Sequence, residues 1–177
     1  MSRVYPYHRV LWLLMRGLGR RRGLLDPLAE FEWTMRPGVG DIDLYPEVNN
    51  GRHFVLFDLA RYDLAVRLGL FRWVRRAKAA FVVGGSTIRY RHRLRPWRKV
   101  TVRTRLVGID DRFFYFEQCC VQNGRTCSRA LVRTGVRRRG AIPPMDVMGA
   151  IGMEVDPFME PWVEAWNAWD DERNHDG

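Results

Sequence analysis

The sequence predicts an α+β fold, in which an antiparallel sheet of about five strands wraps around one long central helix. Residues 52–69 form the longest apolar stretch with helical spacing in the middle of the chain. From residue 79 to residue 139 the apolar period changes to two, which is typical of strands. No long Ser/Gly/Pro linker or internal repeat divides the 177 residues, so we expect one main domain.

Turn-forming residues delimit the expected strands. A short strand at 31–36 ends at Pro37. After the central helix and a second helical segment at 71–78, breaks fall near Pro96, at Asp110 and at the Asn-Gly pair 123–124. The strands between these breaks should form an antiparallel meander. Their expected ranges are 80–95, 99–110, 112–122 and 125–138.

Both ends of the chain add helical segments to the sheet. We expect a basic amphipathic helix within residues 1–30, a central domain at 31–142 and a helical extension at 143–177. In residues 5–22 an arginine stripe opposes an apolar stripe, so this helix packs either on the protein or on a membrane surface. Its run of six apolar residues is too short to span a bilayer, and a signal peptide is not expected.

The C-terminal extension begins with a methionine-rich connection. Pro157 or Pro161 then opens the last helix. Trp162, Trp166 and Trp169 follow at helical spacing, and we expect this tryptophan stripe to face the core or a partner subunit.

The cysteines and histidines indicate no metal or cofactor. Three cysteines are too few for a disulfide framework, although the Asn-Gly turn would place Cys120 across from Cys127. We expect reduced thiols. The four histidines are scattered and form no zinc pattern, so no cofactor is expected.

The chain is strongly basic, with 30 Lys+Arg against 20 Asp+Glu and a net charge of +10, which favours anionic partners. In the strand at 80–95, alternation places four arginines on one face and His92 on the other, inward face. Further arginines could extend the row into a basic field. The candidates are Arg89, Arg91, Arg93, Arg95, Arg103, Arg105, Arg129, Arg133 and Arg137.

This arginine row has two interpretations: a solvated outer face, or a docking surface for nucleotide phosphates or an acidic carrier protein. A nucleic-acid partner is not expected, because no recognised motif is present and the aromatic residues are not interleaved with the basic ones.

The chemistry is expected at residues 41–51, which read Asp-Ile-Asp-Leu-Tyr-Pro-Glu-Val-Asn-Asn-Gly directly before the central helix. A carboxylate on a turn that leads into a helix start lies beside backbone N–H donors, which can polarise a carbonyl. Asp43 is the favoured catalytic residue, and Asp41 is the weaker candidate. The alternative for Asp43 is a purely structural turn or cap, and Asn49 fits an N-cap.

This order of elements, with its Asp-x-Asp and Asn-Asn turn, resembles the hotdog-fold acyl-CoA thioesterases of the 4-hydroxybenzoyl-CoA thioesterase type. The resemblance covers roughly residues 31–139. It places the family's catalytic aspartate on Asp43 and its helix start on Asn49, Asn50 and Gly51. Glu47 stands where that family has a histidine. An ionised carboxylate cannot donate a hydrogen bond, whereas an imidazole can.

The resemblance implies a hotdog fold and an acyl-CoA thioesterase, with Asp43 as nucleophile or general base and no cofactor. It also implies a homodimer or homotetramer with its sites at the subunit interface. Arg91 and Arg93 would bind the coenzyme A phosphates. The alternative is a non-catalytic hotdog protein that binds acyl or lipid ligands, or a membrane surface through residues 5–22. The expected location is cytoplasmic, with peripheral membrane contact as an open alternative.

Overall fold

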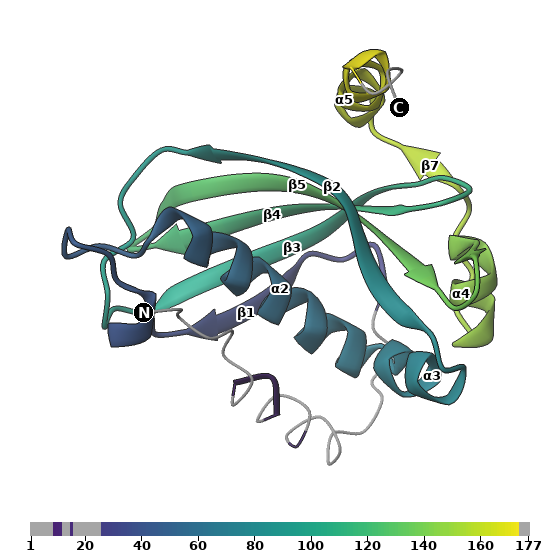
Figure 1. The fold of residues 1–177 in the computed structure, drawn as a ribbon, viewed down its shortest axis with the longest axis horizontal. Coiled ribbons are helices and arrows are strands. Elements are labelled where there is room, and N and C mark those ends of the chain that lie inside the picture. The colour runs from purple at the N-terminus through teal and green to yellow at the C-terminus, as the bar shows by residue number, and fades with distance from the viewer. Residues whose placement is uncertain (1–8, 12–14, 16–25, 174–177) are drawn as a thin grey trace.

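The computed structural model describes residues 9–11, 15 and 26–173 and has the expected α+β architecture (Figure 1). A seven-stranded sheet in the order β1-β3-β4-β5-β2, with β6 beside β5 and β7 beside β3, curls around helix α2. The predicted four-strand meander is therefore wrong for the strand expected at 80–95, which pairs with the strand expected at 125–138 and leaves the edge of the strand expected at 99–110 to β1. The strands are β1 (Phe31–Met35), β2 (Ala80–Tyr90), β3 (Val100–Ile109), β4 (Phe114–Gln122), β5 (Arg125–Arg137), β6 (Ala141–Ile142) and β7 (Phe158–Met159). The helices are η1 (Val39–Asp41), α2 (Asn50–Arg67), α3 (Leu70–Arg76), α4 (Pro144–Ala150) and α5 (Pro161–Arg173).

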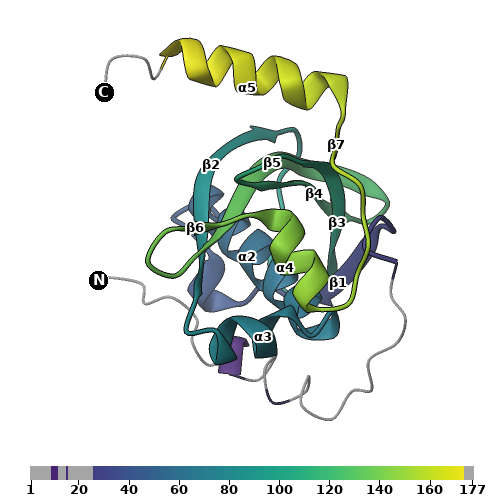
Figure 2. The ribbon, with the colours of Figure 1, turned by 90° about the vertical axis from the view of Figure 1, so that its right-hand side faces the viewer.

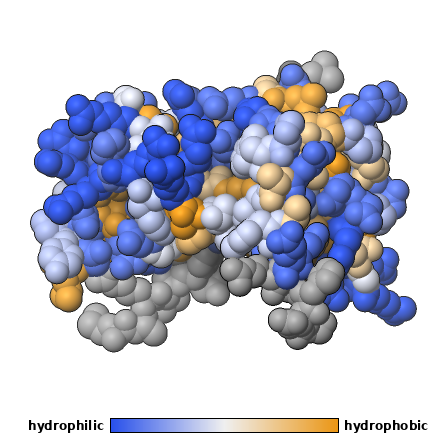
Figure 3. Space-filling model, turned by 90° about the horizontal axis from the view of Figure 1, so that it is seen from above, coloured by the Kyte–Doolittle hydropathy of each residue, from blue (hydrophilic) through white to orange (hydrophobic). Residues whose placement is uncertain are grey.

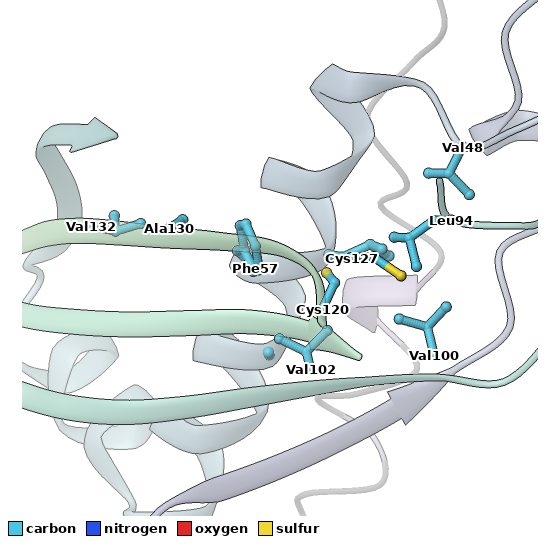
Figure 4. Close-up of a cluster of buried hydrophobic side chains, with 11 residues drawn as sticks. Val48, Phe57, Leu94, Val100, Val102, Cys120, Cys127, Ala130 and Val132 are labelled. Atoms are coloured by element: carbon cyan, nitrogen blue, oxygen red, sulfur yellow. The ribbon is translucent and has the colours of Figure 1, made fainter. Parts of the chain in front are cut away.

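Helix α2 lies in the hollow of the sheet, so most of its surface is buried on both flanks (Figures 1 and 2). One core cluster joins the N-terminal half of α2 to the inner faces of β3, β4 and β5 (Figure 4). Full burial of one such side chain stabilises the fold by about 1.5–3 kcal/mol, so this cluster fixes the helix against the sheet. Its members are Val48, Leu56, Phe57, Ala60, Leu94, Val100, Val102, Cys120, Cys127, Ala130 and Val132.

Strand β2 ends at Tyr90, earlier than the sequence predicted. The N–H groups of Arg91 and His92 both donate to the carbonyl oxygen of Cys127, at 2.7 and 3.0 Å. Because two donors share one acceptor, the regular ladder and its alternation stop there. Only Arg89 of the predicted four-arginine row is therefore part of the strand, and His92 is exposed instead of inward.

The hairpin between β4 and β5 has the predicted turn but a different register. Asn123 and Gly124 have φ values of 52° and 73°, which Asn-Gly pairs adopt readily. A bulge next to the turn shifts the pairing, so Cys120 lies opposite Ser128 and the predicted pairing with Cys127 is wrong. The three cysteines are free, as expected.

The C-terminal segment contains a helix, α4, that the sequence analysis read as a methionine-rich connection. Helix α5 then crosses the outer face of the sheet, opposite α2 (Figure 2). Val163 is fully buried there and Trp166 is half-buried, but Trp162 and Trp169 are exposed. Trp162 and Trp169 therefore do not face the core of this chain, because the buried stripe of α5 runs through Val163, Trp166 and Asp170. The alternative, that they face a partner subunit, stays a prediction.

Four arginines on the outer face form ion pairs with carboxylates. This face is largely hydrophilic where Figure 3 shows it from the side of α5. The ion pairs join Arg103 with Glu32, Arg105 with Glu117 and Glu160, Arg129 with Glu117, and Arg133 with Asp170. These ion pairs offset part of the charge of the predicted basic field, and this part of the face fits the interpretation as a solvated outer face.

The predicted helix at 5–22 lies mostly outside the described residues; residues 9–11 and 15 are helical. None of the helices within the described part of the chain combines the length and apolar character needed to cross a bilayer.

Candidate active site at the start of helix α2

A tight turn between η1 and α2 presents the candidate site. The backbone bridge between Ile42 and Val48 closes the turn. Asn49 is the N-cap of α2, as predicted, and its side-chain oxygen accepts a hydrogen bond from the N–H of Gly51 at 3.0 Å. The unpaired N–H groups and dipole of an 18-residue helix thus point at the turn, which favours negative charge there.

Asp43 and Glu47 occupy the two ends of this turn. The N–H of Asp43 donates to the carbonyl oxygen of Glu47 at 3.2 Å, and the Asp43 carboxylate accepts from the N–H of Tyr45 at 2.9 Å. Asp43 is half-buried, so its other carboxylate oxygen can face a ligand. The neighbouring tip residues Leu44 and Tyr45 are exposed, which leaves apolar surface beside the carboxylate.

Asp41 is a structural anchor. The residue is 1% exposed, and its carboxylate accepts hydrogen bonds from both terminal nitrogens of Arg9, at 3.1 and 2.8 Å, and from the N–H of Gly38 at 2.9 Å. Arg52 of α2 lies 3.7 Å away. These contacts occupy the carboxylate and tie the turn to the helix, so Asp41 is unsuited to proton transfer.

The loop after β2 brings two of the predicted binding residues to the same place. The N–H of Val48 donates to the carbonyl oxygen of Leu94 at 2.8 Å, which fastens this loop to the turn. Arg93 lies 3.1 Å from the Glu47 carboxylate. The side chains of Arg91 and Arg93 are exposed, and both belong to the loop that adjoins the helix start.

A buried polar cluster beneath the helix start was missed by the sequence analysis. His53 is 2% exposed, its Nδ1 lies 2.7 Å from the Ser128 hydroxyl, and its ring meets that of Tyr90 edge-on. The Tyr90 hydroxyl donates to the carbonyl oxygen of Asn50 at 3.0 Å. Burial lowers the pKa of His53 to about 4, so the ring is neutral at pH 7. The helical spacing of His53 from Phe57 was the signal that could have placed it inside.

Residues 37–166 match the thioesterase-like superfamily. Among curated proteins, THEM6 of Danio rerio is 37% identical over 115 residues, which are 65% of this chain and 56% of that protein. The chain spans about half the length of the curated relatives it matches.

Solved structures share the fold. A hypothetical protein from Thermus thermophilus aligns with a TM-score of 0.65 and 23% identity, over 72% of this chain and all of that one. A 1,4-dihydroxy-2-naphthoyl-CoA thioesterase from Synechocystis aligns with a TM-score of 0.61 and 12% identity, over 70% of this chain and 95% of that one. The hotdog arrangement predicted from the sequence is thereby confirmed.

Proposed function

Because the chain belongs to the thioesterase-like superfamily, we propose that it hydrolyses an acyl-CoA thioester at the start of helix α2. The observation that carries this proposal is the position of Asp43, a half-buried carboxylate on the turn that leads directly into the N-terminus of a long helix. Such a position combines a base or nucleophile with backbone donors for a developing oxyanion.

In the general-base route, Asp43 accepts a proton from water as the water oxygen attacks the thioester carbonyl. The carbon–sulfur bond then breaks, the thiolate leaves and takes up a proton, and the acyl group departs as a carboxylic acid. In the nucleophilic route, Asp43 attacks the carbonyl itself and water hydrolyses the resulting anhydride. The N–H of Gly51 already donates to the cap, so we assign the oxyanion contact to the N–H of Asn50 or to a facing subunit.

Recognition of coenzyme A is assigned to the loop after β2. Arg91 and Arg93 are exposed beside the turn and carry the positive charge that phosphates require. Arg93 forms an ion pair with Glu47 at 3.1 Å, but its side chain stays largely exposed, so it can also contact a ligand. Arg91→Gln should raise KM with little effect on kcat, because phosphate contacts bind the ground state and the transition state alike.

The test of the proposal is thiol release from short, long and aromatic acyl-CoAs by the wild type and by Asp43→Asn. We expect the variant to lose at least about 100-fold in kcat, the usual contribution of a positioned base. Asp41→Asn is unsuitable as the control because it disturbs the fold. Asp156→Asn, at an exposed position outside the helix start, is the matched control and should keep full activity.

One observation favours a second function, an acyl-binding hotdog protein without turnover. Glu47 is a carboxylate at the position where thioesterases of the 4-hydroxybenzoyl-CoA type have a histidine, which can donate a hydrogen bond. Glu47 is instead paired with Arg93. If the wild type binds acyl-CoA but releases no thiol from any member of the panel, this second function replaces the first. Turnover that persists in Asp43→Asn would instead remove Asp43 from the mechanism.

We also assign a homodimer to this fold, with the free edge of β2 as the contact. Strand β2 stands at one end of the sheet order and has 11 residues, whereas the opposite edge strand β1 has 5. Among the described strands β2 pairs only with β5, and a long edge of this kind is a template for a second copy.

A further inference from the structure

A cavity of about 150 Å³ lies between the C-terminal half of α2 and the inner face of the sheet, away from the helix start. Its walls come from α2, from strands β2 to β5 and from α3 and α4, and they are mostly apolar. Representative lining residues are Leu64, Leu68, Phe81, Leu106, Phe114 and Val136. Asp43, Glu47 and Asn49 are not among the lining residues, so the cavity does not contain the residues of the proposed active site.

The Thr134 hydroxyl is the unusual feature of this cavity. Thr134 lies on β5 between Val132 and Val136, which place its side chain on the same inner face. It is 8% exposed and lines the cavity, yet its Oγ1 has no hydrogen-bond partner among the described residues. A buried polar atom without a partner costs about 1–3 kcal/mol, and native proteins rarely keep one without a reason.

The two charged side chains that line the cavity neutralise each other, and Tyr62 is, besides Thr134, the other polar residue of the lining. Asp58 and Arg61 form an ion pair on successive turns of α2, and Arg61 also donates to the buried side chain of Gln118. Burial raises the pKa of Asp58, and the neighbouring Arg61 guanidinium opposes this rise. A ligand with a net charge would disturb this balance, so the cavity favours a neutral group.

Size and chemistry together define the occupant. An engineered apolar protein cavity of about this volume stays dry and binds benzene. The space therefore holds a group of roughly six carbon atoms. An oxygen atom on that group would give the Thr134 hydroxyl a hydrogen-bond partner, since a hydroxyl can donate to a carbonyl or pair with another hydroxyl. Val83 is 55% exposed, so the lining reaches the surface at the edge of β2.

We propose that this cavity binds a compact, neutral, apolar group of about six carbons that carries one hydroxyl or carbonyl oxygen, and that Thr134 hydrogen-bonds that oxygen. The group is either the acyl part of a thioester or a separate small molecule. The binding does not depend on catalysis, so the proposal stands or fails independently of the function assigned to Asp43.

Phenol and toluene provide the test, because they have nearly the same shape and differ in one hydroxyl. Their dissociation constants are measured by calorimetry or NMR titration on the full chain, in wild type and in Thr134→Val. The valine keeps the shape of the side chain and removes the hydroxyl, so the variant should fold. We expect its preference for phenol over toluene to fall roughly tenfold, because a buried phenol hydroxyl loses its partner.

Two further variants make the result specific. Thr87→Val makes the same chemical change on β2 outside the cavity lining and should leave the preference unchanged. Ala65→Leu adds volume to the α2 wall and should weaken both probes about equally. Absence of saturable binding of either probe to the wild type, or an unchanged preference in Thr134→Val, would overturn the proposal.

A non-hydrolysable thioether, hexyl-coenzyme A, separates the two sources of the ligand. If it displaces phenol, the cavity holds the acyl group of a thioester. If phenol binds with the same affinity in its presence, the cavity holds a separate small molecule. The readout is binding, so it is unaffected by whether the chain turns over any substrate.

Discussion

At the scale of single residues, the two histidines near the helix start differ in burial. His53 is buried against Ser128 and Tyr90, and burial lowers its pKa from 6.5 to about 4. His92 lies in the loop after β2 and is exposed. The folded state therefore binds a proton at His53 less readily than the unfolded state does, so the free energy of unfolding depends on pH.

We predict that the wild type loses stability as the pH falls from 6.5 toward 4. In this range the unfolded chain binds a proton at His53 that the folded chain excludes, so acid favours unfolding; above pH 6.5 both states are neutral and the contribution is complete. The shift corresponds to about 3 kcal/mol at most. Urea unfolding at pH 7, 5.5 and 4 measures it, with His53→Gln and His92→Gln as the comparison.

His53→Gln should be less stable at pH 7 but should lose less stability on acidification than the wild type. His92→Gln should follow the wild-type pH dependence, because it removes an exposed side chain and leaves the buried His53 in place. Parallel pH curves for the wild type and His53→Gln would show that His53 is not the responsible group.

At the scale of elements, α5 shows how an amphipathic pattern can mislead. Its tryptophans repeat at helical spacing, but the side of the helix that is buried is decided by the residues that meet the sheet. Val163 packs on Val107 and Leu131, and Trp166 lies over the guanidinium of Arg133 at 5.2 Å. Trp169 points away from this contact and is exposed.

The two tryptophans of α5 give a matched pair for measuring its docking. Trp166→Ala removes half-buried packing and the cation–π contact with Arg133, and should cost roughly 2–3 kcal/mol of the free energy of unfolding. Trp169→Ala removes the same side chain from an exposed position and should stay within about 0.5 kcal/mol. Equal losses measured by urea unfolding would mean that the two residues contribute alike to the docking of α5.

The elements that sequence reasoning predicted are those defined by period and turn chemistry. The central helix, the β3–β4 and β4–β5 hairpins and the Asn-Gly turn were readable, because 3.6- and two-residue periods differ clearly. The place of β2 in the sheet was not readable, since β2 pairs with β5 at the far end of the sheet and not with β3, its neighbour in the sequence. The end of β2 was not readable, since it is set by one Cys127 carbonyl that accepts two N–H groups. Bulges of this kind arise from long-range pairing, and local sequence carries no sign of them.

The candidate site shows the same division. The Asn49 cap follows from residue type and position alone. The anchoring role of Asp41 did not follow, because Arg9, which pairs with it, is 32 residues away. The spacing of His53 from Phe57 could have placed it inside, but its Ser128 partner lies 75 residues away. The unpartnered hydroxyl of Thr134 depends on strands that pair across the whole sheet, so only the folded molecule reveals it.

At the scale of the whole molecule, helices cover both faces of the sheet. Helix α2 covers the inner face, and α5 lies across the outer face (Figures 2 and 3). Ion pairs occupy much of the outer surface beside α5. A second copy of the chain therefore has little apolar sheet surface to pack on. The edge of β2 remains, and backbone hydrogen bonding along it would extend the sheet from one subunit into the next.

We predict that the wild type is a dimer in solution and that Ser86→Lys dissociates it. In a two-fold antiparallel pair centred on β2, the exposed Ser86 lies close to its own copy, so two lysines would face each other and repel. The dissociation constant should rise at least about tenfold, and part of the loss should return at high salt, which screens the charges. Ala80→Lys adds the same charge at the exposed start of β2, far from the two-fold axis, and should remain dimeric. Light scattering across a concentration series measures all three proteins, and a Ser86→Lys variant that dimerises as tightly as the wild type would move the contact away from the β2 edge.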